Sequence, residues 1–166
     1  MSKTIVIMGS SNSLGDTYRI CKSIVDKYGY KFQDLNELVI MPYDYEHENK
    51  DDDFLGFMRH VVKTYDTIIM ATPVYWYSMS GIMKNYIDRF TDLLTIEKEL
   101  GRQLRGKSLL SLSVSKSDDC PEEFRMPFQR TANYLGMEWK GYVHFPVDEE
   151  AIKNTRFEEF GDFLNK

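Results

Sequence analysis

The chain has 166 residues, of which 42% are hydrophobic and 28% are charged, a composition typical of a globular protein with enough length for one core. We therefore expect residues 1–166 to form a single domain. The 21 Lys and Arg residues against 26 Asp and Glu residues give a formal charge of −5, which disfavours nucleic acid and anionic membranes as partners.

The cysteines and histidines show no metal-binding pattern. Cys21 and Cys120 lack CxxC spacing and are too few for a disulfide framework, and the three histidines are widely separated. The apolar run before Gly9 is too short for a signal peptide or a membrane span. We expect a cytoplasmic protein without a metal site, in which Cys21 is a core residue and Cys120 is inert.

The first elements of the chain are a strand, a helix and a second strand. Thr4–Met8 is a β-branched and apolar run, as expected for a strand buried on both faces. Apolar residues from 21 to 28 recur at helical spacing and predict a helix that starts near Gly15. Lys31–Leu35 is the second predicted strand, and Leu38–Ile40 either extends it or forms an irregular stretch.

An acidic stretch, His47–Asp53, separates these elements from the next helix and is expected to be a solvated loop and not a metal site. An apolar stripe over Phe54–Tyr65 at i, i+3, i+4 spacing predicts the clearest helix in the chain. The third predicted strand, Thr67–Ala71, stops at Pro73.

A helix over Ile82–Leu94 follows, with Ser78 or Ser80 as its amino-terminal cap. The remaining predicted elements are a strand at Ser108–Val114, a helix over Phe124–Leu135, a strand at Tyr142–Phe145 and a helix over Phe157–Leu164. Alternating strands and helices predict an α/β fold, a parallel sheet covered by helices on both faces. Ligands of such sheets bind beyond the carboxyl ends of the strands.

The loop after the first strand, Gly9–Thr17, is rich in glycine and hydroxyl side chains. Backbone N–H groups at a helix start, together with the helix dipole, can hold a phosphate. Because the loop contains no Lys or Arg, its chemistry suits a terminal monophosphate. It lacks both the GxxxxGK pattern of nucleoside triphosphate sites and the GxGxxG pattern of dinucleotide sites. The alternative is an ordinary capped turn between a strand and a helix.

The loop after the third strand, Thr72–Ser78, carries three consecutive aromatic residues: Tyr75, Trp76 and Tyr77. It would lie on the same rim of the sheet as Gly9–Thr17. A flavin ring needs an apolar or aromatic wall and nearby backbone polar groups, and this loop can supply both. The alternative is that the aromatic residues pack in a subunit interface or against one another.

Three segments resemble one family. ATPVYWYSMSGIMKNYIDRF is similar to the flavin-ring segment of the NADPH-dependent FMN reductase and iron–sulfur flavoprotein branch of the flavodoxin-like superfamily. Gly9–Thr17 resembles the family's GSPRxxGNT-type phosphate loop, and RTANYLGMEWKGYV resembles its late helix-to-strand segment. The resemblance implies a flavodoxin-like three-layer sandwich with a five-stranded parallel sheet in the order 2-1-3-4-5.

The resemblance also implies an FMN site on particular residues. The implied phosphate contacts are Ser10, Asn12, Leu14, Gly15, Asp16 and Thr17. The implied ring contacts are Pro73, Val74, Tyr75, Trp76, Tyr77 and Ser78, with a further contact at Ser115.

The chain departs from the family pattern in three places. Asn12 stands where the family often has Arg, and residues 115–120 replace a glycine-rich third loop. The cysteine cluster of the iron–sulfur branch is absent, so no iron–sulfur centre is expected.

The function implied is that of an NAD(P)H oxidoreductase. Hydride from NADH or NADPH passes through FMN to a small acceptor such as a quinone, flavin, azo or nitro compound, and no catalytic side chain is assigned. The family resemblance favours a homodimer or homotetramer. A flavodoxin-type electron carrier with a protein partner is the main alternative, and a flavin-free interaction module is another. A phosphoacceptor domain is disfavoured because Gly9 and Ser10 stand where paired acidic residues would be required.

Overall fold

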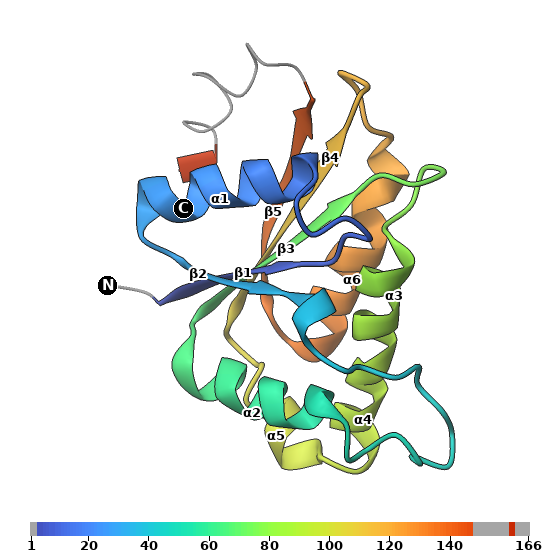
Figure 1. Ribbon diagram of the computed structural model, residues 1–166. Coiled ribbons are helices and arrows are strands. Elements are labelled where there is room, and N and C mark those ends of the chain that lie inside the picture. Colours follow the sequence, from blue (N-terminus) through green and yellow to red (C-terminus); the bar gives the residue numbers. More distant parts are fainter. Residues whose placement is uncertain (1–2, 148–159, 162–166) are drawn as a thin grey trace.

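Parallel strands form one sheet in the computed structural model, which describes residues 3–147 and 160–161 (Figure 1). The strands are β1 (Thr4–Met8), β2 (Lys31–Asp34), β3 (Thr67–Pro73), β4 (Ser108–Ser115) and β5 (Glu138–Pro146). Their spatial order is β2-β1-β3-β4-β5, and every neighbouring pair is parallel. The predicted fold class and strand order are confirmed.

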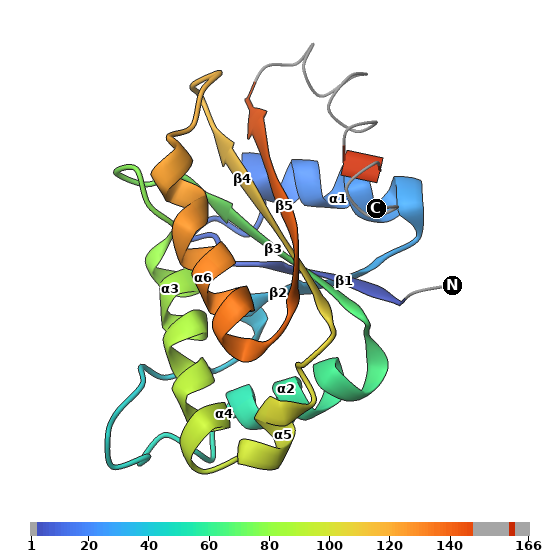
Figure 2. The same cartoon turned by 180° about the vertical axis from the view of Figure 1, so that it is seen from behind.

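Helices cover both faces of this sheet (Figures 1 and 2). The α-helices of the described residues are α1 (Asp16–Tyr28), α2 (Asp53–Thr64), α3 (Gly81–Asp88), α4 (Asp92–Thr95), α5 (Lys98–Arg102) and α6 (Met126–Leu135). The helix α1 packs on one face, and α2, α3 and α6 pack on the other. Among the described residues, no helix is long and apolar enough to cross a membrane.

The central strands are buried on both faces, which explains their uninterrupted apolar sequences. Ile5 and Ile7 face the core under α2 and α3, whereas Val6 and Met8 face the core under α1. Alternate residues of a strand point to opposite faces, so a sheet covered on both sides needs apolar residues at every position. Each such side chain stabilises the fold by roughly 1.5–3 kcal/mol.

The strand ends differ from the predictions at the edges of the sheet. The strand β5 begins at Glu138, four residues before the predicted Tyr142, because an edge strand is covered less completely and its first residues are not apolar. A register shift opposite Leu109 and Leu110 accompanies Gly141, whose φ of 128° favours glycine. The strand β2 ends at Asp34, whose carboxylate accepts the N–H of Asn36 and begins a 3-10 turn.

The predicted helix over Ile82–Leu94 is a chain of helical segments: α3, a 3-10 turn at Arg89–Thr91, and α4. Of the two predicted caps, Ser80 is correct, because its Oγ accepts the N–H of Met83 at 3.1 Å. Ser78 instead belongs to a turn before the helix.

The predicted helix over Phe124–Leu135 begins as a 3-10 turn at Glu122–Arg125, and α5 was not predicted. The last predicted helix, Phe157–Leu164, lies outside the described residues except for Phe160 and Gly161, which are helical. Phe160 is fully buried and contacts the ring of Tyr28.

The prediction that His47–Asp53 is a solvated loop is wrong at Asp52, because Arg89 buries it. The side chains of Arg89 and Asp52 are 1% and 6% exposed and form an ion pair. Arg89 Nε also donates to Asp92 Oδ2 at 2.8 Å, and its NH2 donates to the carbonyl of Asn49 at 3.0 Å. His47 Nδ1 lies 2.9 Å from the other oxygen of Asp92. These contacts fasten the segment between β2 and α2 to α4.

Two buried serines on one face of β4 differ in whether their hydroxyl groups are hydrogen-bonded. Ser111 and Ser113 are both fully buried, but Ser111 Oγ has no hydrogen-bond partner among the described residues, whereas Ser113 Oγ contacts Tyr142 and His144. An unpaired buried hydroxyl costs about 1 kcal/mol or more.

We expect Ser111→Ala to raise the melting temperature by about 2–4 °C, measured by differential scanning fluorimetry. Ser113→Ala is the matched control and is expected to lower it. A Ser111→Ala variant that melts below the wild type would contradict the expectation.

Candidate functional site

A cavity of about 400 Å³ lies at the carboxyl ends of β1, β3 and β4. The loops that follow these strands lie at the same end of the sheet, because the carboxyl ends of parallel strands are all on one side (Figure 1). The predicted residues that line the cavity are Ser10, Asn12, Gly15, Asp16, Thr17, Pro73, Val74, Tyr75 and Ser115. Its volume lies within the range typical of small-molecule sites.

The first loop has hydrogen-bond donors that the protein leaves available. No side chain caps the amino terminus of α1, where Gly15 occupies the cap position in an extended conformation. The first N–H groups of such a helix have no partner within the helix, so they can bind an anion. Thr17, which lines the cavity, adds a hydroxyl group, whereas the hydroxyl of Ser10 donates to the carbonyl of Asn12.

Neighbouring side chains hold the shape of this loop. Asn12 Oδ1 accepts the N–H of Leu14 at 3.1 Å, and Ser10 Oγ donates to the carbonyl of Asn12 at 3.2 Å. Asn36, from the turn after β2, donates to the carbonyl of Ser10 at 2.5 Å and to Ser13 Oγ at 3.1 Å. The loop is therefore fastened before any ligand arrives.

The loop after β3 forms a tight turn whose tip is aromatic. Tyr75 and Ser78 exchange two backbone hydrogen bonds, at 2.8 and 3.0 Å. Trp76 and Tyr77 lie between them with φ of 49° and 64°, a conformation that bulky residues rarely adopt. Their side chains are 94% and 75% exposed. The turn thus holds two aromatic rings in solvent at the rim of the cavity, at a cost in backbone strain.

Two side-chain contacts join the first two loops. Ser11 Oγ and Tyr75 Oη are hydrogen-bonded to each other at 2.8 Å. Deeper in the fold, Ser80 Oγ donates to the carbonyl of Gly9 at 2.7 Å while capping α3. A Cβ atom at Gly9 would lie 2.9 Å from the Cβ atom of Met83, so glycine allows this close approach.

The remaining predicted residues lie beside the cavity but do not line it. They are Leu14, Trp76, Tyr77 and Ser78, and all four are exposed. Three lining residues were not predicted: Val114, Lys116 and Val147.

Lys116 supplies a positive charge that the first loop lacks. It follows Ser115 directly and is exposed. The signal that could have identified it is its place at the carboxyl end of β4, next to a residue already predicted. Across the cavity, Asp16 in the first turn of α1 adds a negative charge, and Arg19 pairs with it at 3.6 Å.

The cysteines of the described chain take no part in this cavity. Cys21 is fully buried in the core under α1, as predicted, and burial raises the pKa of its thiol. No group of His, Cys, Asp or Glu side chains suited to a metal ion occurs among residues 3–147 and 160–161.

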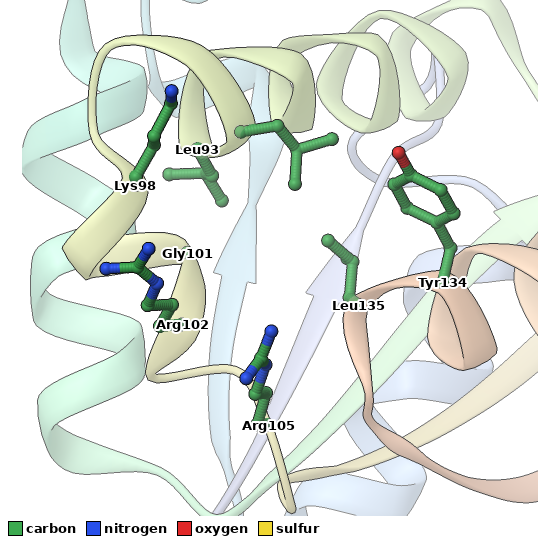
Figure 3. A pocket seen from close by; sticks show the side chains of 8 residues that line it. Leu93, Lys98, Gly101, Arg102, Arg105, Tyr134 and Leu135 are labelled. Carbon is green, nitrogen blue, oxygen red and sulfur yellow. The ribbon is translucent and has the colours of Figure 1, made fainter.

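A second cavity, of about 190 Å³, lies near the opposite ends of the strands and is lined partly by basic side chains (Figure 3). Lys98, Arg102 and Arg105 line one side of it, and Tyr134 and Leu135 line the other. Arg105 lies just before β4 and Leu135 just before β5, so this cavity is near the amino ends of the strands. It contains none of the predicted site residues.

Comparisons with known proteins identify relatives of this chain. YwqN of Bacillus subtilis (strain 168), whose name marks it as a candidate NAD(P)H-dependent FMN-containing oxidoreductase, is 28% identical over 153 residues, 85% of this chain and 83% of that protein. An NADPH azoreductase from Bacillus sp. (strain OY1-2) is 29% identical over 96 residues, 58% of this chain and 54% of the azoreductase.

A solved structure shares the fold. General stress protein 14 from Treponema denticola, in complex with FMN, superposes with a TM-score of 0.65 at 18% identity, covering 98% of this chain and 96% of that one. Residues 2–130 match the family described as NADPH-dependent FMN reductase. The chain therefore belongs to the NADPH-dependent FMN reductase family and is an NAD(P)H-dependent FMN oxidoreductase.

Proposed function

We propose that the chain binds FMN in the cavity at the carboxyl ends of β1, β3 and β4, and passes electrons from NADH or NADPH to a small acceptor there. The acceptor class is a quinone, flavin, azo or nitro compound. The observation that carries the proposal is that the uncapped amino terminus of α1 and the aromatic turn after β3 lie next to the same cavity of about 400 Å³.

The phosphate of FMN would bind at the start of α1. The residues that would surround it are Ser10, Asn12, Leu14, Gly15, Asp16 and Thr17. The N–H groups of Leu14 and Gly15 already donate to Asn12, so the backbone N–H groups of Asp16 and Thr17 and the hydroxyl of Thr17 would hold the phosphate. Lys116 would add the charge that Arg supplies elsewhere in the family.

The flavin ring would lie between the loop after β3 and the loop after β4. Pro73, Val74 and Tyr75 would form one wall, and Val114 and Ser115 the other. Trp76, Tyr77 and Ser78 would border the open edge where donor and acceptor enter in turn.

Bound FMN would supply the redox chemistry, and the protein would supply binding and orientation. Among the described residues, none of the side chains that line the cavity is a histidine or cysteine. We assign no catalytic side chain, because the transfer of hydride to the flavin needs no protein acid or base.

The experiment that tests the proposal is a visible spectrum of the untagged protein with FMN, recorded before and after anaerobic addition of NADPH or NADH. We expect flavin absorbance that bleaches with the nicotinamide alone. Binding without bleaching would favour the flavodoxin-type carrier, which needs a partner protein. A colourless protein whose melting temperature FMN does not shift would favour the flavin-free module.

Asp16→Asn is expected to tighten FMN binding by about two- to fivefold, because it removes a negative charge next to the phosphate position at the start of α1. The measurement is quenching of FMN fluorescence by the apoprotein. Asp26→Asn, near the other end of α1 and paired with Lys22 at 2.8 Å, is the control and should change nothing. Weaker binding by Asp16→Asn would contradict the phosphate position.

We also propose that residues 1–166 act as one domain in a cytoplasmic homodimer or homotetramer. The exposed Trp76 and Tyr77 support self-association beside the cavity, since exposed aromatic residues are enriched at interfaces. The free thiols of Cys21 and Cys120 support a reducing compartment. Light scattering on the purified protein tests the oligomeric state.

A further inference from the structure

The loop after β4, residues 115–119, is the third loop of the cavity. It has no glycine, and few of its own hydrogen bonds hold its backbone in place. Ser115 Oγ donates to the carbonyl of Ser117 at 3.3 Å and accepts its N–H at 3.1 Å, both contacts within three residues. The carbonyl of Ser115 accepts the N–H of Val147 at 2.6 Å. Yet this loop carries Ser115 and Lys116 into the wall of the cavity. Something must fix its backbone if that wall is to be in place before FMN binds.

His144 provides that anchor from the neighbouring strand. It lies on β5 opposite Ser113 of β4. The strand β5 runs beside β4 (Figure 2). His144 Nε2 lies 2.9 Å from the carbonyl oxygen of Ser117 and 3.3 Å from Ser115 Oγ, and Nδ1 lies 2.7 Å from Ser113 Oγ. A carbonyl oxygen only accepts hydrogen bonds, so Nε2 carries a proton and donates it to the loop.

The other side of the imidazole is held by a chain of hydroxyl groups. Ser113 is fully buried, and its Oγ lies 2.7 Å from Tyr142 Oη as well as from His144 Nδ1. Burial, with Cys120 nearby, raises the pKa of the Tyr142 phenol, so the phenol stays protonated and can donate. With a neutral imidazole protonated at Nε2, Nδ1 accepts from Ser113 Oγ, Ser113 Oγ accepts from Tyr142 Oη, and Nε2 donates to the loop. The ring is then held on the strand side through Nδ1 and faces the loop through Nε2.

We propose that His144 is a positioning residue of the flavin cavity, which fixes the third loop through the carbonyl of Ser117 and so places Ser115 and Lys116 in the cavity wall. The inference rests on the proposed function, because it assumes that FMN occupies this cavity. It goes beyond that function by assigning a role to β5, whose histidine does not line the cavity.

Three substitutions at His144 separate the contacts of its two ring nitrogens. His144→Leu removes the contacts of both nitrogens. His144→Gln can place an amide donor near the Nε2 position and keep the bond to Ser117, whereas His144→Asn reaches only the Nδ1 position. Ser113→Ala leaves the imidazole but removes the group that orients it. His60→Leu, an exposed histidine on α2, is the matched control.

The first readout is FMN affinity, measured by fluorescence quenching with the full chain after FMN has been removed. Loss of the bond to Ser117 is expected to weaken binding about three- to tenfold in His144→Leu and His144→Asn. His144→Gln should bind within about twofold of the wild type, and Ser113→Ala should lie between.

The second readout needs no FMN. Trypsin cleaves after Lys116 only when the loop leaves its anchored position, so cleavage at Lys116 in the apoprotein reports loop release. We expect His144→Leu and His144→Asn to be cut there faster than the wild type, with His144→Gln and His60→Leu unchanged. Ser113→Ala provides the same comparison if His144→Leu fails to fold.

The two readouts together distinguish the possible failures. If the wild type does not bind FMN, the proposed function fails, while the cleavage rates still show whether His144 anchors the loop. If the wild type binds FMN and His144→Leu matches it in affinity, or in cleavage at Lys116, the positioning role is overturned. Equal losses in His144→Gln and His144→Leu would also overturn it, because the bond to Ser117 would then not be the cause.

Discussion

Replacing Arg89 by Met is expected to lower the free energy of unfolding by roughly 3–5 kcal/mol. Arg89 is 1% exposed and lies against two carboxylates, Asp52 and Asp92, which are themselves almost fully buried. Methionine removes the positive charge that Arg89 places between them, and the two carboxylates stay largely buried, with side chains 6% and 3% exposed. The loss of the bonds from Arg89 to the carbonyls of Met41 and Asn49 adds to the cost.

Urea unfolding followed by circular dichroism measures this effect. Arg59→Met is the matched control, because Arg59 forms an exposed ion pair with Glu97 and exposed pairs contribute only about 0–1 kcal/mol. An unchanged urea midpoint in Arg89→Met would show that the buried pair does not stabilise the fold. Because the lining of the cavity at the carboxyl ends of β1, β3 and β4 includes none of these residues, FMN affinity of the folded variant should stay within about twofold of the wild type.

The second large effect is expected at Gly9. In Gly9→Ala the new methyl group would lie 2.9 Å from both the Cβ and the backbone nitrogen of Met83, so α3 and the first loop must separate. Overpacking of this kind costs about 1–3 kcal/mol. The bond from Ser80 to the Gly9 carbonyl joins the phosphate loop to α3, so its displacement disturbs the cavity directly.

FMN affinity should therefore fall by roughly five- to a hundredfold, since binding must restore the strained arrangement that the free variant can relax. Gly56→Ala is the control: a Cβ at Gly56 meets nothing within 4 Å, and the exchange should stabilise α2 by about 0.5–1 kcal/mol without changing FMN affinity. Gly9→Ala with wild-type affinity would mean that the close approach of α3 does not shape the site.

The sequence is most informative where burial is complete. Thr4–Met8 and Thr67–Ala71 lie between two helical layers, so every position is apolar or β-branched and the strands are evident without any structure. The edge strand β5 is covered only in part, and its first residues, Glu138 to Gly141, show no such pattern. The cap was predictable to one of two serines, Ser78 or Ser80, because the hydrogen bond from a cap side chain to a helix start is local.

The sequence alone does not reveal which residues contact each other when they are far apart along the chain. Asp52 and Arg89 are 37 residues apart, and no local pattern distinguishes this buried carboxylate from the exposed acidic residues beside it. Lys116 is similar: the positive charge of the cavity comes from the loop after β4, about a hundred residues from the loop expected to bind phosphate. Such contacts depend on the strand order, which brings β1, β3 and β4 together.

If the aromatic residues of the turn at Tyr75–Ser78 serve electron transfer, as proposed above, stability and turnover favour different residues there. The two central positions of the turn favour Asn and Gly, the pair that hairpins with this backbone use most. A library of variants at Trp76 and Tyr77 selected only for heat resistance should accumulate that pair, and the same library selected for electron transfer should keep aromatic residues. The residues at this turn would then show whether selection for stability or selection for electron transfer has been stronger in this protein.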